Sequence, residues 1–201
     1  MNAIKSIKNF ANNYGFLVED IKKNIKLLEK EINLLLSLVD EKKIKKKEFI
    51  LQSGNICRYS YFLKKGCLKK YYINEEGKER IFEFATENQW IGDQDSFWRM
   101  STSIFNIIAL EKSEIIQISK SNMELLLEKL PKFERYFRIV GNNSLGKYQR
   151  RVKQSLSCSA EERYSDFRND YPGLELRISQ KDIASYLGVS PEFLSTLRRK
   201  V

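Results

Sequence analysis

Residues 179–200 hold the side chains whose types and spacing best suit a chemical task. Ser179 and Asp182 are placed to cap the start of a helix, and Gly188 stands where a tight turn needs a residue without Cβ. Ser190-Pro191-Glu192 has the order that begins a second helix: a capping hydroxyl, a proline whose missing N–H is harmless, and an acid near the helix dipole. Two short helices joined by a glycine turn are typical of a helix-turn-helix.

The apolar spacing supports this prediction. Apolar residues recur at helical intervals on the expected inner faces, at Ile183, Leu187, Leu194 and Leu197, and Ala184 is small where the helices must cross closely. An ordinary helical hairpin in a core shares these features and is the alternative. The second helix is expected to present its outer residues to the major groove of DNA. These residues are Ser190, Pro191, Glu192, Ser195, Thr196 and Arg199.

On DNA these side chains divide into two kinds of contact. Glu192 can accept a hydrogen bond from a cytosine amino group, the Thr196 methyl can touch a thymine methyl, and Ser195 can reach a base or a phosphate. Phosphates are the expected partners of the remaining candidates, which are Arg198, Arg199, Lys200 and, at the start of the first helix, Ser179, Gln180 and Lys181. Base contacts carry sequence information, whereas phosphate contacts position the protein.

The composition excludes several other kinds of chemistry. The chain has no histidine, which removes Ser-His-Asp and Cys-His catalysis, histidine metal sites and histidine-ligated haem. Its three cysteines, Cys57, Cys67 and Cys158, form no CxxC and cannot alone build a four-thiolate cluster or zinc site. We therefore expect three reduced thiols, no metal and no cofactor.

An enzyme is a weaker hypothesis still. Glu83, Asp93 and Asp95 could make a carboxylate cluster, but charged residues near a turn are normally solvated, so we expect no enzymatic activity. The N-terminus has no signal peptide, and the longest apolar runs are too short to span a membrane. We therefore expect a cytoplasmic protein with no membrane partner.

Strands are predicted between residues 49 and 118, where four glycines punctuate aromatic and β-branched runs. The expected strands are Phe49–Gln52, Tyr59–Leu63, Leu68–Ile73, Arg80–Phe84, Phe105–Leu110 and Ile115–Ile118. Asn74-Glu-Glu-Gly77 reads as a hairpin loop. Several short strands at regular turn spacing favour an antiparallel roll, barrel or sandwich.

Helical patterns surround this segment. They predict a helix over residues 18–39, one opened by a Ser121/Glu124 capping box, a long one over 131–157, and one opened by Ser159/Glu162. The aromatic face of the long helix suggests a dimer interface, with packing on the β domain as a compatible alternative. Leu174–Ile178 alternates like a short strand. Glu41–Glu48 is a lysine run that we interpret as a solvated surface connection in preference to a nucleic-acid patch.

The order of β-rich domain, long helix and C-terminal helix-turn-helix resembles the Crp/Fnr superfamily of bacterial transcription regulators, over about residues 40–201. Phe49–Gly54, Phe62–Leu68 and Gly77–Glu79 look like successive turns of its cyclic-nucleotide-type β-roll, and residues 183–195 are the most specific match. The resemblance implies an α+β fold: an antiparallel β-roll, a long dimerisation helix and a C-terminal winged helix-turn-helix. It also implies a homodimer on a roughly two-fold symmetric double-stranded DNA operator, with RNA polymerase a further candidate partner.

The departures from the family bear on its signal. Cyclic-nucleotide-binding members carry a Gly-Glu pair and, about ten residues later, an Arg-Ser or Arg-Thr pair; here Gly92-Asp93 is followed by Ser103-Ile104. Without the arginine a buried cyclic phosphate lacks its charge partner. Gly92, Asp93 and Ser103 are therefore candidates for a degenerate pocket, whose unidentified effector is not cyclic AMP. Pro191 stands where many relatives place a guanine-reading arginine.

We thus expect a sensor domain over residues 1–130, a dimerisation helix over 131–157 and a DNA-binding domain over 158–201. The alternative is a ligand-sensing or protein-interaction module whose C-terminal helices only pack. Net charge does not decide between them, because residues 141–201 hold 11 Lys/Arg against 7 Asp/Glu in a chain whose net charge is +10. The excess therefore lies mostly outside the expected DNA-binding unit.

Overall fold

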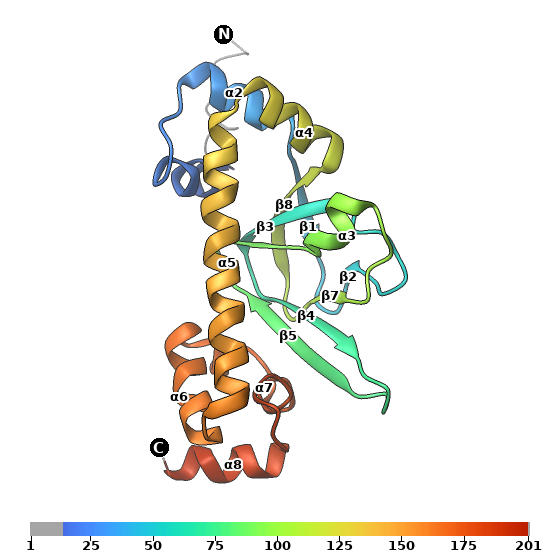
Figure 1. The fold of residues 1–201 in the computed structure, drawn as a ribbon, viewed down its shortest axis with the longest axis vertical. Coiled ribbons are helices and arrows are strands. Elements are labelled where there is room, and N and C mark those ends of the chain that lie inside the picture. Colours follow the sequence, from blue (N-terminus) through green and yellow to red (C-terminus); the bar gives the residue numbers. More distant parts are fainter. Residues whose placement is uncertain (1–13, 201) are drawn as a thin grey trace.

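The computed structural model describes residues 14–200 and contains two four-stranded antiparallel sheets, one long helix and a C-terminal group of short helices (Figure 1). The strands are β1 (Asp40–Ile44), β2 (Phe49–Leu51), β3 (Tyr59–Lys65), β4 (Leu68–Ile73), β5 (Glu79–Ala85), β6 (Gln89–Ile91), β7 (Asn106–Ala109) and β8 (Ser113–Ser119). The sheet orders are β1-β8-β3-β6 and β2-β7-β4-β5. The antiparallel roll is confirmed.

Turn chemistry explains how the chain changes sheet. Gly66 lies between β3 and β4 with a φ of 110°, and a Cβ there would lie 2.2 Å from the Ser113 hydroxyl. Only glycine fits that approach. Gly77 adopts a φ of 73° in the β4–β5 hairpin, where the Asn74 carbonyl accepts its amide at 2.9 Å. The predicted hairpin loop is confirmed.

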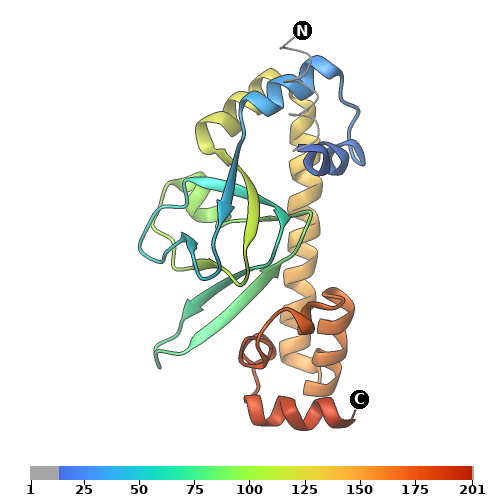
Figure 2. The ribbon, with the colours of Figure 1, turned by 180° about the vertical axis from the view of Figure 1, so that it is seen from behind.

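Helices lie at both ends of the roll and along its side. Residues 14–22 are helical, and the named helices are α2 (Glu29–Ser37), α3 (Gln94–Arg99), α4 (Lys120–Lys129), α5 (Lys132–Ser157), α6 (Ala160–Asp170), α7 (Gln180–Leu187) and α8 (Pro191–Lys200). α5 runs along the roll, with α2 and α4 near its start and α6, α7 and α8 near its end (Figures 1 and 2). The long predicted helix is confirmed.

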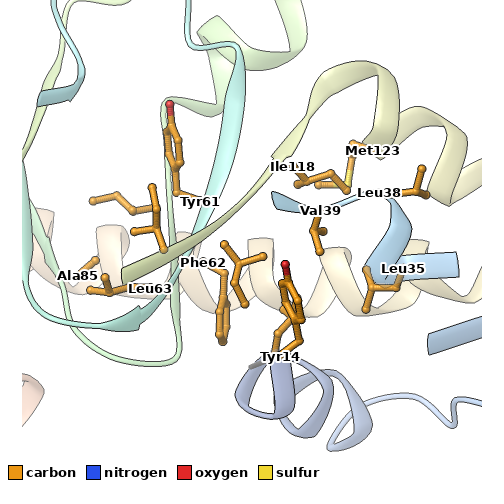
Figure 3. Close-up of a cluster of buried hydrophobic side chains, with 14 of the residues drawn as sticks. Tyr14, Leu35, Leu38, Val39, Tyr61, Phe62, Leu63, Ala85, Ile118 and Met123 are labelled. Carbon is orange, nitrogen blue, oxygen red and sulfur yellow. The ribbon is translucent and has the colours of Figure 1, made fainter. Parts of the chain in front are cut away.

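Two buried clusters hold the fold together. The first cluster fills the roll and joins it to the N-terminal helices and the start of α5; Figure 3 shows Phe62 and Leu63 of the roll, with Leu35 of α2 and Met123 of α4 packed in the same cluster. The second cluster lies between β4–β5 and the C-terminal helices. The C-terminal helices thus share their core with the roll.

Several local predictions are wrong. The helix expected over 18–39 is two helices, because the chain turns at residues 23–28 and the Glu31 carboxylate caps α2 by accepting the Leu28 amide at 2.7 Å. The helix-opening hydroxyl near residue 120 belongs to Ser119, which accepts the Asn122 amide at 3.2 Å, and not to the expected Ser121. The Ser159/Glu162 capping box is confirmed.

The aromatic and β-branched runs did not predict two of the strands, and one predicted strand does not form. β1 overlaps the start of the lysine run. It is an edge strand in which only Ile44 is buried, and its sequence is therefore mostly polar. β6 is three residues long. Leu174–Leu176 is a 3₁₀ helix in which Leu174 is buried and Leu176 is exposed, and no strand occurs between residues 158 and 200. The wing expected of a winged helix-turn-helix is therefore not built from these residues.

Candidate nucleic-acid interface

The helix-turn-helix forms as its capping residues predict. The Ser179 hydroxyl accepts the Asp182 amide at 3.1 Å at the start of α7. Gly188 ends α7 with a φ of 71°, and the Val189 amide donates to the Ala184 carbonyl at 3.0 Å. The Ser190 hydroxyl then accepts the Phe193 amide at 3.2 Å and begins α8. These bonds satisfy backbone groups that the helix ends would otherwise leave unpaired.

The inner faces of α7 and α8 are buried as the spacing predicts. Five side chains on them are at most 5% exposed: Ile183, Ala184, Leu187, Leu194 and Leu197. Their burial stabilises the crossing of the two helices, since each buried aliphatic side chain contributes about 1.5–3 kcal/mol. The remaining side chains are consequently held in a defined outward direction.

The predicted contact residues lie on the outer surface of this unit. Eight of them are exposed: Ser179, Gln180, Lys181, Ser190, Pro191, Glu192, Thr196 and Arg199. Ser195 and Arg198 are half-buried, and the Lys200 side chain lies outside the described residues. α8 lies across the end of the molecule that is farthest from α2, which leaves its outer face open (Figure 1). The structure therefore brings the predicted residues of α8 together on one accessible helix.

Glu192 begins α8 with its carboxylate tied to the helix start. Its own amide and the Ser190 hydroxyl donate hydrogen bonds to the carboxylate and lower the pKa of Glu192 below its usual value. The carboxylate is therefore ionised near neutral pH and complements the helix dipole. Reading a cytosine would require this side chain to turn away from the helix end.

Phe193 is a surface residue of α8 that the sequence reasoning missed. Its side chain is 45% exposed, between Glu192 and the buried Leu194. An exposed aromatic side chain on such a helix can make apolar contact with a thymine methyl. The helical period did not reveal this exposure, because Phe193 lies one turn before the buried Leu197 and residues four apart share a helix face.

Aromatic packing joins the helix-turn-helix to the roll. Phe84 of β5 is 2% exposed and lies between rings of the C-terminal helices, with centroid distances of 5.4 Å to Tyr186, 5.9 Å to Tyr171 and 6.3 Å to Phe167. Such ring pairs contribute about 0.5–1.5 kcal/mol beyond the area they bury. α7 consequently packs directly on β5.

Polar contacts reinforce the same junction. The Lys69 ammonium of β4 donates to Glu79 at 2.7 Å and to Asp182 of α7 at 2.8 Å. Burial lowers the pKa of Lys69, but the bonds to Asp182 and Glu79 outweigh it and leave this pKa raised. Arg151 of α5 donates to the carbonyls of Phe82 and Ile81 on β5 and of Tyr186 on α7. The orientation of α7 is thus set by the roll and α5 together.

The candidate effector residues form part of the roll interior. Ser103 donates its hydroxyl hydrogen to the Asp93 carboxylate at 2.7 Å, and both side chains are buried. Asp93 also caps α3 by accepting the Ser96 amide. The buried Lys70 ammonium donates to the Gly92 carbonyl at 2.8 Å and to Glu83 at 3.2 Å. Asp93 and Ser103 therefore satisfy their polar groups with protein partners inside the roll.

A cavity of about 370 Å³ lies between the roll and α5. Its walls are mainly aromatic and aliphatic, with polar groups from Glu83, Gln94 and Tyr148. The Tyr148 hydroxyl donates to the Glu83 carboxylate at 3.1 Å, and burial raises the pKa of Tyr148, with the Glu83 charge adding to the effect. A volume of this size and mixed character suits a small molecule.

α5 carries exposed apolar side chains at the edge of this cavity, which Leu145 also lines. Leu145 is 54% exposed, Val152 58% and Leu156 80%, and their spacing of seven and four residues places them on one face of the helix. Among residues 14–200, no group of three or more Cys, Asp or Glu side chains is arranged to hold a metal ion. No helix within the same range has the length and apolar character needed to cross a membrane.

Known proteins resemble both the sequence and the structure. Residues 41–129 match the family model of the cyclic nucleotide-binding domain. The chain is 30% identical over 183 residues to the regulatory protein HlyX of Actinobacillus pleuropneumoniae, which covers 85% of this chain and 75% of HlyX. FixK2 from Bradyrhizobium japonicum has a TM-score of 0.71 at 19% identity, over 81% of this chain and 83% of that one. A Crp/Fnr family transcriptional regulator from Eubacterium rectale has a TM-score of 0.67 at 18% identity, over 87% and 83%.

Proposed function

The chain belongs to the Crp/Fnr superfamily of DNA-binding transcription regulators, and from this premise we propose that it binds a roughly two-fold symmetric operator as a homodimer through α8. The observation that carries the proposal is the division of α7 and α8 into fully buried inner faces and exposed outer faces. A hairpin that only packs can have the same division, and the membership of the regulator family favours DNA binding over that alternative. Such a regulator works in the cytoplasm, where its operator is, and its transcriptional partner is RNA polymerase.

In this proposal four side chains of α8 read bases. Glu192 accepts a hydrogen bond from a cytosine amino group, Ser195 bonds a neighbouring base or phosphate, and the Thr196 methyl and Phe193 contact thymine methyls. Pro191 gives this chain no guanine-reading arginine at that position. The preferred operator therefore differs from that of relatives with an arginine there.

The remaining candidates position the helix on the DNA backbone. Arg198, Arg199 and Lys200 follow the base-reading positions at the end of α8 and bind phosphates. The free amides at the start of α7 hold a phosphate of the same half-site, together with Ser179, Gln180 and Lys181. These contacts are independent of base sequence, so their loss weakens binding to all DNA alike.

The dimer partner covers the outer face of α5. Leu145, Val152 and Leu156 form an apolar stripe there, and a second copy of the chain supplies the same stripe in a parallel helix pair. Val152→Asp/Leu156→Asp is expected to sediment as a monomer where the unmodified chain sediments as a dimer. A double variant that remained dimeric would contradict this interface.

The effector site is the cavity between the roll and α5, with Gly92 in its wall. Asp93 and Ser103 lie behind this wall and bond each other, which supports an effector other than a cyclic nucleotide. The long helix that lines the cavity also carries the proposed dimer stripe and contacts β5 and α7 through Arg151. A molecule bound in the cavity can thereby alter the placement of α8.

Selection of bound duplexes from random-sequence DNA tests the proposal. We expect one enriched, two-fold symmetric motif. Glu192→Ala should relax preference at one position of each half-site, by about 1–3 kcal/mol of discrimination. Arg199→Ala should weaken binding to every sequence and reduce the salt dependence. Absence of any enriched motif, with no binding at low salt, would instead support a sensing module without DNA binding.

A further inference from the structure

The turn between β1 and β2 carries three consecutive lysines, Lys45, Lys46 and Lys47, which we call the lysine turn. All three are exposed. The turn is held firmly: the Glu48 amide donates to the Lys45 carbonyl at 3.0 Å, and the Lys47 amide donates to the Ala109 carbonyl of β7 at 2.8 Å. The lysine side chains therefore project from a fixed backbone.

Lys47 occupies a backbone conformation that does not favour lysine. Its φ is 68°, in the left-handed region where glycine and asparagine are preferred. A side chain of ordinary type costs about 1 kcal/mol there. Asparagine or glycine would suit the backbone at this position better, so the turn itself does not require a lysine.

Two cations near the lysine turn, Lys69 and Arg177, are already neutralised, whereas Lys46 and Lys47 are not. Lys69 is paired with Glu79 and Asp182, and Arg177 with Glu87 and Glu111. Within the described residues, Lys46 and Lys47 have no acidic partner within ion-pair distance. Among the described cations that line the cleft between this turn and α7, the uncompensated charge therefore lies on Lys46 and Lys47.

The lysine turn faces the start of the helix-turn-helix. Lys46 and Lys47 line a cleft of about 540 Å³ whose lining also includes Ser179, the residue that caps α7. In a helix-turn-helix complex the first helix crosses the DNA backbone. A duplex held at the start of α7 would therefore continue toward the two lysines.

We propose that Lys46 and Lys47 bind the phosphate backbone of DNA that flanks the operator half-site. This inference rests on the proposed function, since the duplex must first be positioned by α7 and α8. The contact extends the DNA-binding surface from the C-terminal helices onto the sensor domain. It assigns a binding role to a lysine run that the sequence alone favoured as a solvated connection.

The test compares two lengths of the selected operator. The short duplex of about 20 bp holds two half-sites one helical turn apart, and the long one adds about 15 bp of unrelated sequence on each side. Dissociation constants of the full chain are measured at several salt concentrations. The unmodified chain is expected to bind the long duplex more tightly and with a steeper salt dependence, by about 0.9 in slope for each added phosphate contact.

The variant Lys46→Gln/Lys47→Asn removes the two charges, and asparagine tolerates the positive φ at position 47. It is expected to reduce long-duplex affinity to that of the short duplex and leave short-duplex affinity unchanged. When the salt concentration rises from 50 to 200 mM, each phosphate contact is expected to reduce the affinity by a further factor of about 3.5. A variant that has lost a contact should therefore lose that factor of salt dependence. The matched control Lys43→Gln/Lys65→Gln removes two exposed lysine charges that lie outside the cleft, and should preserve the length effect.

Equal affinity of the unmodified chain for both lengths would overturn the inference while the selected motif still supported α8 binding. Equal weakening of both lengths by the lysine-turn variant, or an equal effect of the control, would also overturn it, because the charge would then act on any DNA. Absence of a selected motif would contradict the proposed function, and the inference with it. The two proposals therefore fail in distinguishable ways.

Discussion

Phe84→Ala tests whether the C-terminal helices depend on the roll for their stability. Phe84 belongs to β5, yet the rings around it come from α6, from α7 and from Tyr171 at the end of α6. Its side chain is 2% exposed. Removing the ring therefore leaves a void on the face where the helix-turn-helix packs, and the rest of the roll interior is not touched.

The expected cost follows from the burial. Replacement of a fully buried phenylalanine by alanine typically costs about 3–5 kcal/mol. In a chain of this size 1 kcal/mol corresponds to about 2–4 °C in melting temperature, so the loss amounts to about 6–20 °C. Because the ring partners lie in the C-terminal helices, these helices should lose most of that stability.

Two spectroscopic signals separate the parts of the molecule. Both tryptophans, Trp90 and Trp98, belong to the roll and its α3, so their fluorescence follows the roll. Circular dichroism at 222 nm follows the helices, most of which are C-terminal to the roll. In Phe84→Ala the dichroism transition should begin well below the fluorescence transition, and affinity for the selected operator should fall.

Phe133→Ala is the matched control, because Phe133 is also fully buried but belongs to the first cluster, at the start of α5. It should lower the fluorescence transition at least as much as the dichroism transition. If Phe84→Ala lowered both transitions together by the same amount, the two clusters would unfold as one unit and the argument would be wrong. Unchanged transitions would refute the assigned energy.

Three further predictions concern thiols and the sensor. Burial raises the pKa of Cys57 and raises that of Cys67 to about 12, so a thiol reagent at pH 8 should modify only the partly exposed Cys158 rapidly, and all three thiols only after denaturation. The folded Cys67 thiol keeps its proton above its ordinary pKa of 9.0, so its contribution to the free energy of unfolding is complete below pH 9 and is lost as the pH rises toward 12. Between these two pH values, the free energy of unfolding of Cys67→Ala should therefore fall less than that of the unmodified chain. Cyclic AMP should leave the melting temperature unchanged because Asp93 and Ser103 bond each other, whereas a ligand at 100 times its Kd would add about 2.7 kcal/mol.

Local signals made the DNA-binding helices predictable. Ser179, Gly188 and Pro191 act within four residues of their own positions, through caps, a left-handed turn and a fixed φ. The buried inner faces follow the same short period. For these reasons the bounds of α7 and α8 and the exposed side of α8 follow from the sequence with little help from tertiary structure.

Non-local contacts account for most of what the sequence could not predict. The packing of α7 on β5 depends on Phe84 and on the Lys69–Asp182 ion pair, whose members lie 113 positions apart. The bond between Asp93 and Ser103 depends on how α3 returns to the roll. β1 forms because β8 supplies its hydrogen-bond partners, although its own residues are mostly charged.

The same non-local pairing decides which positive charges can meet DNA. The net charge of +10 divides into +4 for residues 141–201 and +6 for the first 140, so more than half of the positive excess lies before residue 141. In the roll, however, Lys64, Lys69 and Lys70 are each bound by acidic side chains. Lys46 and Lys47 keep their charge and line the same cleft as Ser179 at the start of α7. The sensor domain therefore offers DNA a small number of fixed cations beside the recognition unit, and its total charge is a poor guide to where they lie.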